Sequence, residues 1–118
     1  MNFVKDPILY KFVRSCLNRA YLEIDESQLS ADERFSLDTI LSVIRYAEDE
    51  WKDVDDFIKF LQDNYVRLYK DAIKRLPKEL VYRLFTKTLE KCLELEEVKN
   101  NSSIYSTIIS VLKTIKEL

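Results

Sequence analysis

None of the 118 residues of this chain is glycine. Glycine is the residue that most readily adopts a positive φ and lets the backbone approach a ligand closely. Its absence excludes the glycine-rich phosphate loop, the dinucleotide-binding fingerprint and the EF-hand calcium loop, each of which needs glycine at a fixed position. Turns must therefore be built from asparagine, aspartate, serine and proline.

Apolar residues recur along most of the chain at intervals of three and four, the spacing of one helix face, and no segment alternates with a period of two. This pattern predicts an all-α fold, a compact and mostly antiparallel bundle of about five amphipathic helices. We expect one domain over residues 1–118. The expected helices cover residues 7–21, 31–48, 54–76, 78–98 and 103–117.

Three of these helices have recognisable start signals. Asp6 precedes Pro7, a cap residue before a proline at the first helical position. Ser30 and Glu33 have the spacing of a capping box, in which each residue's side chain accepts from the other's backbone N–H. Pro77 interrupts the third helix and can open the fourth.

The other boundaries rest on weaker signals. Asp53 or Asp55 can cap the third helix, since aspartate accepts from free N–H groups at a helix start. Without glycine, the asparagines at residues 100–101 are the best candidates for a left-handed helix stop. Ser102 or Ser103 would then cap the last helix.

Cys16 and Cys92 are the two cysteines, and both fall on apolar faces of expected helices. We interpret them as small buried hydrophobic residues. The chain has no histidine and no Cys-x-x-Cys pair, which argues against zinc and helical di-iron sites. We predict no metal and no cofactor.

The sequence also bears on location. Its longest uncharged stretches, such as residues 100–112, are shorter than the roughly 20 apolar residues of a membrane span. The first residues reach charge and proline too early for the apolar core of a signal peptide. We therefore expect a cytoplasmic protein without a membrane partner. The abundance of lysine, glutamate and isoleucine suggests a thermophile or a small archaeal or viral genome.

Charge is segregated along the chain although the net charge is only −2. Residues 23–63 hold 13 acids and 4 bases, whereas residues 64–91 hold 8 bases and 3 acids. Acids at helix starts and bases at helix ends explain part of this, because they offset the helix dipole. The alternative is a basic surface that binds nucleic-acid phosphates. Its residues would be Arg67, Lys70, Lys74, Arg75, Lys78, Arg83 and Lys87.

A more remote alternative is an all-α, magnesium-dependent nucleotide pyrophosphohydrolase. Such a site needs pairs of acids on facing helices, and Glu23/Glu26 with Asp53/Asp56 imitate the spacing. Glu23 and Glu26 lie outside a well-patterned helix, so one pair lacks a rigid support. We expect no catalytic residues and no enzyme activity.

Several apolar residues lie at the margins of the helix stripes or off them, and would be free to contact a partner. Tyrosine suits such contacts because its ring buries area while its hydroxyl remains hydrogen-bonded. The candidate partner-binding residues are Tyr69, Ile73, Tyr82, Tyr105 and Ile109. Our leading hypothesis is a non-catalytic protein-interaction module, an accessory or regulatory subunit of a larger intracellular assembly, with a protein partner or a second copy. Nucleic acid is the alternative partner.

Overall fold

The structure is a computed structural model and describes residues 12–118, with the side chain of Phe12 left out. Within this range it is an all-α bundle, as the apolar periodicity predicts. Its elements are α1 (Phe12–Tyr21), the 3₁₀ turn η2 (Glu26–Gln28), α2 (Ala31–Asp49), α3 (Val54–Phe60), the π-helical segment η3 (Leu61–Tyr65), α4 (Val66–Ala72), α5 (Lys78–Leu93), α6 (Glu96–Lys99) and α7 (Ser102–Glu117).

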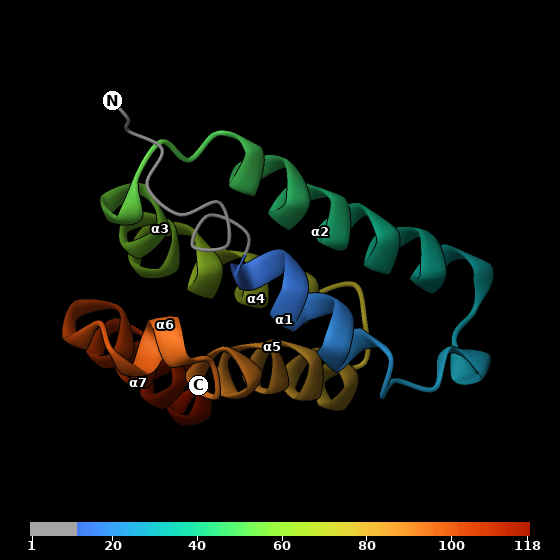
Figure 1. The fold of residues 1–118 in the computed structure, drawn as a ribbon. Coiled ribbons are helices and arrows are strands. Elements are labelled where there is room, and N and C mark those ends of the chain that lie inside the picture. Colours follow the sequence, from blue (N-terminus) through green and yellow to red (C-terminus); the bar gives the residue numbers. More distant parts are fainter. Residues whose placement is uncertain (1–11) are drawn as a thin grey trace.

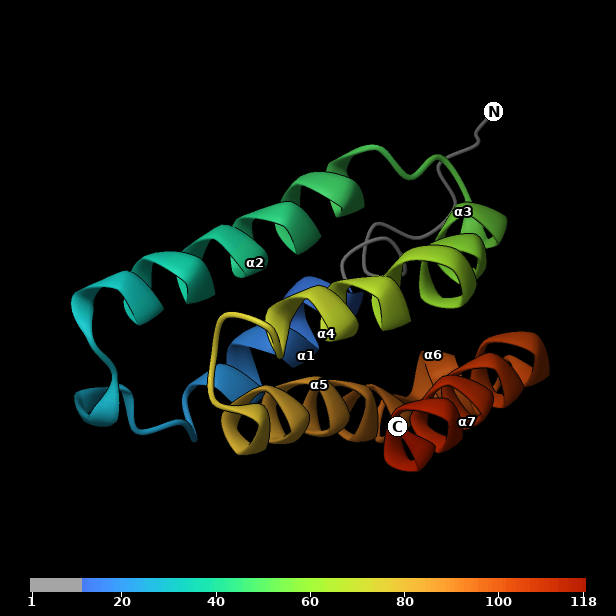
Figure 2. The ribbon, with the colours of Figure 1, turned by 180° about the vertical axis from the view of Figure 1, so that it is seen from behind.

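The long helices alternate in direction along the chain, with α3, η3 and α4 forming one continuous rod (Figure 1). In both views α2 lies along one side of the bundle, and α5 and α7 lie along the opposite side (Figures 1 and 2). Because α2 is outermost, it has one face toward the core and one face toward solvent. The expected start at residues 6–7 lies outside the described residues.

Two of the predicted helix starts are confirmed. Ser30 and Glu33 form the reciprocal capping box, with the Glu33 N–H donating to Ser30 Oγ at 3.2 Å and the Ser30 N–H donating to Glu33 Oε1 at 2.9 Å. Asp53 caps α3 by accepting from the Asp56 N–H at 3.1 Å. Helices α2 and α3 are therefore separate elements with residues 50–53 between them.

The prediction for the last interhelical turn is wrong. Asn100 has φ −88° and ψ 0°, which is right-handed, and no described residue has a positive φ. Asn101, not Ser102 or Ser103, is the cap of α7, because its side chain accepts from the Ile104 N–H at 3.1 Å. The turn needs no left-handed residue because the short helix α6 already redirects the chain.

The third expected helix, residues 54–76, differs in two ways. It ends at Ala72, after which residues 73–76 form hydrogen-bonded turns before Pro77. Its middle, η3, has the wider turns of a π-helix. In a regular α-helix each residue turns about 100°, so residues spaced by four drift by about 40° per step. The wider π turn offsets this drift and keeps Phe57, Leu61, Tyr65 and Tyr69 on the buried face.

The fourth expected helix, residues 78–98, is also shorter than predicted. Helix α5 ends at Leu93, and α6 follows after a break at residues 94–95. Val98 lies six residues after Cys92, so the two would lie on different faces of one continuous α-helix. The positions that share the Cys92 face are three and four residues after it, and they hold Leu95 and the exposed Glu96. The break changes the phase, and Val98 becomes fully buried.

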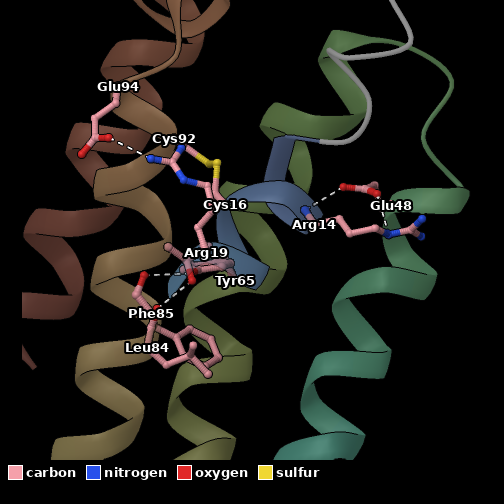
Figure 3. Close-up of a disulfide and its surroundings, with 10 residues drawn as sticks. Arg14, Cys16, Arg19, Glu48, Tyr65, Leu84, Phe85, Cys92 and Glu94 are labelled. Carbon is pink, nitrogen blue, oxygen red and sulfur yellow. Dashed lines mark hydrogen bonds and ion pairs between the residues drawn. A yellow bond between two sulfur atoms is a disulfide. The ribbon is translucent and has the colours of Figure 1, made fainter. Parts of the chain in front are cut away.

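Helices α1 and α5 are joined by a disulfide between Cys16 and Cys92 (Figure 3). Both cysteines are buried, as expected, and the bond between them is a feature that the sequence analysis does not predict. Their Cα atoms are 5.5 Å apart, within the usual range for a disulfide. An exposed ion pair between Arg19 and Glu94, at 3.1 Å, joins the same two helices.

A buried carboxylate ties α1 to α2. Glu48 of α2 accepts from the Arg14 backbone N–H at 2.8 Å and lies 3.0 Å from Arg14 Nε (Figure 3). Arg14 also donates to the Arg45 carbonyl and to Asp49, at 3.1 and 2.9 Å.

No helix within residues 12–118 is both long enough and apolar enough to cross a membrane.

Candidate protein-interaction surface

The solvent face of α2 carries large apolar side chains. The buried face of this helix is formed by Leu37, Leu41, Ile44 and Glu48. On the opposite face, Phe35 is 73% exposed, Tyr46 is 69% exposed and Val43 is 43% exposed. We call these three residues the α2 outer stripe. They lie eight and three positions apart, so they share one side of the helix.

The C-terminal half of α2 forms one wall of a groove, and α3, η3 and α4 form the other. We call it the α2–α4 groove, and its volume is about 770 Å³, within the range of about 300–1,000 Å³ usual for ligand sites. Its apolar lining begins at Val43 and Tyr46, so it is continuous with the α2 outer stripe. The lining residues are Val43, Tyr46, Ala47, Glu50, Trp51, Lys52, Asp56, Lys59, Phe60, Asn64, Arg67 and Leu68.

Trp51 is held in place at the floor of this groove by other aromatic rings. Its ring centroid lies 5.0 Å from that of Phe57 and 5.4 Å from that of Phe60. The contacts continue from Phe60 to Tyr65 at 6.3 Å and from Tyr65 to Phe85 at 5.0 Å. Tilted and edge-on ring pairs of this kind are favourable. The groove floor is therefore anchored to α5 in the core.

The charges along the groove differ between its two walls. Lys59 and Arg67, on the α3–α4 wall, are exposed and form no ion pair with any residue from 12 to 118. Asp56 accepts from the Lys52 backbone N–H at 2.7 Å and so has a structural partner. Glu50 lies on the α2 wall. The α3–α4 wall thus carries two bases and one acid, and the α2 wall carries a single acid.

The five partner-binding residues predicted from the sequence are not brought together. Tyr105 and Ile109 are exposed neighbours on α7, at 41% and 43% exposure. Tyr82 is exposed on α5, and Ile73 is half-buried after α4. Tyr69 is fully buried, so the expectation that it lies at the surface is wrong.

The phase shift at η3 explains the position of Tyr69. In an unbroken α-helix Leu68 lies seven residues after Leu61 and shares its face. With the π turn, Tyr69 takes that place and Leu68 lines the groove. The Tyr69 hydroxyl is buried without a hydrogen-bond partner among the described residues, and burial raises its pKa above the ordinary value.

The α2 outer stripe was missed by the sequence reasoning, although a signal for it exists. Once the buried stripe of α2 is assigned, Phe35, Val43 and Tyr46 are the large apolar residues left on the other face. The groove gives no such signal. Residues on its opposite walls, such as Tyr46 and Arg67, are more than 20 positions apart in the sequence.

The predicted basic surface is exposed along its full length. All seven residues named for it are exposed, and Lys87 forms an ion pair with Glu90 at 3.6 Å. Near Pro77 the bases mix with acids along a second groove of about 610 Å³. Its charged lining residues are Asp25, Glu79, Arg83, Lys87, Glu90 and Lys116.

Three of the four acids considered for a magnesium site have structural partners. Glu23 lies 2.6 Å from Lys91 Nζ, and this hydrogen bond lowers the pKa of the Glu23 carboxyl. Asp53 and Asp56 accept backbone N–H groups at the start of α3. Within the described part of the chain, no group of three or more histidine, cysteine, aspartate or glutamate side chains is placed to hold a metal ion.

No protein-family model, curated protein or solved structure is significantly similar to this chain.

Proposed function

We propose that the protein is a non-catalytic protein-interaction module that acts as an accessory or regulatory subunit of a larger intracellular assembly. The observation that carries this proposal is the α2 outer stripe. Phe35 and Tyr46 are each more than two thirds exposed on one helix face. Burying a large apolar side chain is worth about 1.5–3 kcal/mol, so a partner that covers this face gains substantial binding energy.

The exposed pair on α7 supports the same proposal. Tyr105 and Ile109 lie one helical turn apart and form a smaller apolar surface. Aromatic residues are enriched at the centres of protein interfaces. The two surfaces are on different helices, so each can be tested separately.

The test is affinity capture from the native host, with the bound proteins quantified by mass spectrometry. We expect wild-type protein to recover a stoichiometric partner that resists nuclease. Phe35→Asp/Tyr46→Asp should lose it, and Tyr105→Asp/Ile109→Asp tests the α7 pair. All three proteins should have the same far-UV circular dichroism, because the changed side chains are exposed. Recovery of no stoichiometric partner by wild type would contradict the proposal.

A control variant addresses the added charge. Ser106→Asp/Ser110→Asp adds the same two negative charges at exposed positions of α7 without removing apolar surface. It should capture the partner as wild type does. Loss of the partner in this control would mean that capture depends on charge and not on the apolar residues.

Nucleic-acid binding is the second candidate. It is favoured by the exposure of all seven bases between Arg67 and Lys87. Phosphate contacts make affinity fall linearly with the logarithm of salt concentration, and each lost contact reduces the slope by about one. Lys70→Glu/Lys74→Glu/Lys78→Glu should therefore weaken binding to a DNA or RNA probe and flatten its salt dependence. Salt-independent binding would dismiss this candidate.

The cytoplasmic location is part of the proposal and must accommodate the disulfide. Structural disulfides are uncommon in the reducing cytosol of mesophiles, whereas intracellular proteins of hyperthermophiles are an exception. The Cys16–Cys92 bond therefore favours a thermophilic host if the protein is cytoplasmic. Alkylation of thiols in rapidly quenched cells, followed by mass spectrometry, measures how much of the protein is oxidised there.

A further inference from the structure

We propose that the α2–α4 groove binds an amphipathic helix of a partner protein, with the acidic edge of that helix against Lys59 and Arg67. This inference rests on the proposed interaction function and names the site and the chemistry of the partner. Three observations support it: the apolar floor of the groove, the exposed bases Lys59 and Arg67 on one wall, and the repulsion between two copies paired through their α2 outer stripes.

The floor of the groove suits an apolar helix face. Among its apolar lining residues, Tyr46 and Val43 are exposed, Trp51 and Leu68 are partly buried and Phe60 is buried. An amphipathic helix that binds in a groove presents anchors at i, i+3 or i+4, and i+7. A volume of about 770 Å³ accommodates a few such side chains, since ligand sites of about 300–1,000 Å³ bury most of a drug-sized molecule.

The unpaired bases define the polar edge of the partner. Lys59 and Arg67 are eight residues apart on one continuous rod, which is about 12 Å at 1.5 Å per residue. Acids at i and i+7 of a bound helix span a similar length and can reach both cations. Since neither base pairs with another described residue, binding breaks no existing ion pair at these two positions.

A symmetric pairing of two copies through their α2 outer stripes fits less well. The most exposed apolar helix face of the chain is the α2 outer stripe, which is flanked by acids. An antiparallel pair of α2 helices with Phe35 beside the other copy's Tyr46 would put Asp32 opposite Asp49 and close to Glu50. Facing like charges are destabilising. A partner helix that lies in the groove does not bring these acids face to face.

The experiment uses the full chain and two synthetic peptides. Both are amphipathic helices of about 18 residues, long enough to be helical, with the same leucine stripe. One has glutamates along the polar edge and the other has lysines. Trp51 is the single tryptophan and lies in the groove, so its intrinsic fluorescence reports binding without a label. The glutamate peptide should bind about tenfold more tightly than the lysine peptide, because of the charge match.

Matched variants separate the groove from the general basic surface. Lys59→Glu/Arg67→Glu should weaken the glutamate peptide by about tenfold or more and improve binding of the lysine peptide. Lys74→Glu/Lys78→Glu makes the same change in net charge outside the groove and should leave both affinities nearly unchanged. Thermal melts check that the variants are folded.

Three results would overturn the inference. These are equal binding of the two peptides, equal losses in the two charge variants, and self-association of the peptide-free protein that Lys59→Glu/Arg67→Glu abolishes. Failure here is distinguishable from failure of the proposed function. If a cellular partner is still captured by Lys59→Glu/Arg67→Glu and lost by Tyr105→Asp/Ile109→Asp, the groove assignment is wrong and the interaction module stands.

Discussion

Loss of the Cys16–Cys92 disulfide should remove a large part of the stability of the bundle. The bond closes a loop with a sequence separation of 76. The chain-entropy relation for a loop of this size gives about 4.5 kcal/mol of stabilisation at 25 °C. Total stabilities of single domains are about 5–15 kcal/mol. The reduced protein is therefore expected to lie near the threshold of folding.

The assay is guanidinium denaturation of oxidised and reduced wild-type protein, followed by far-UV circular dichroism. The two forms contain the same side chains, so the comparison isolates the cross-link. The oxidised form should have the higher midpoint and the smaller m-value, because its denatured state is more compact. Since both sulfurs are buried, reduction should be slow until denaturant is added. The variant Cys16→Ala/Cys92→Ala should resemble the reduced form.

One result would refute this reasoning directly. If thiol titration of the freshly purified protein in guanidinium finds two free cysteines, the bond does not form under those conditions. Equal midpoints for a protein that is demonstrably oxidised and for the same protein reduced would instead show that the cross-link adds no stability.

Three further predictions concern buried polar groups. Tyr65→Phe should cost about 1–2 kcal/mol, because the Tyr65 hydroxyl donates to the Phe85 carbonyl at 2.8 Å. Tyr69→Phe should be neutral or stabilising, because it removes a hydroxyl that has no hydrogen-bond partner among residues 12–118. Urea titrations that give the same sign for both would contradict this. Glu48→Gln should cost about 3 kcal/mol of stability by breaking a buried ion pair. Asp49→Asn should cost less than about 1 kcal/mol, because the ion pair between Asp49 and Arg14 is exposed. Thermal melts can measure both losses. Burial raises the pKa of Tyr65 above its ordinary value of 10.0, so the native state favours the neutral phenol. Stability should therefore be retained below pH 10.0 and fall above it, with a shallower fall in Tyr65→Phe. An equal fall in both proteins would assign the effect to other groups.

Local signals in the sequence were sufficient for the fold class and for several helix starts. The Ser30 capping box and the Asp53 cap depend on residues no more than three positions apart. Helix α2 occupies nearly the expected range because both its cap and its apolar period are local. Such features need no knowledge of what the helix packs against.

Features that depend on packing between distant residues were not predictable in the same way. The pairing of Cys16 with Cys92 requires α1 to lie against α5, which no local pattern specifies. The groove likewise requires α2 to lie beside α3 and α4, which no local pattern specifies. The outer stripe is intermediate between these cases, since Phe35 and Tyr46 could be found by subtracting the buried face of their own helix.

The π segment η3 links the core to the groove, and a deletion tests this. A π turn holds one more residue than an α turn, so removing the exposed Asn64 should convert residues 54–72 into a regular α-helix while keeping Phe57, Leu61 and Tyr69 in phase. Thermal melts should show unchanged or increased stability. The groove loses one lining residue, so peptide affinity measured through Trp51 should change even though the core does not. A loss of about 3 kcal/mol or more, the cost of a core truncation, would show instead that the π turn is needed to bury Tyr69.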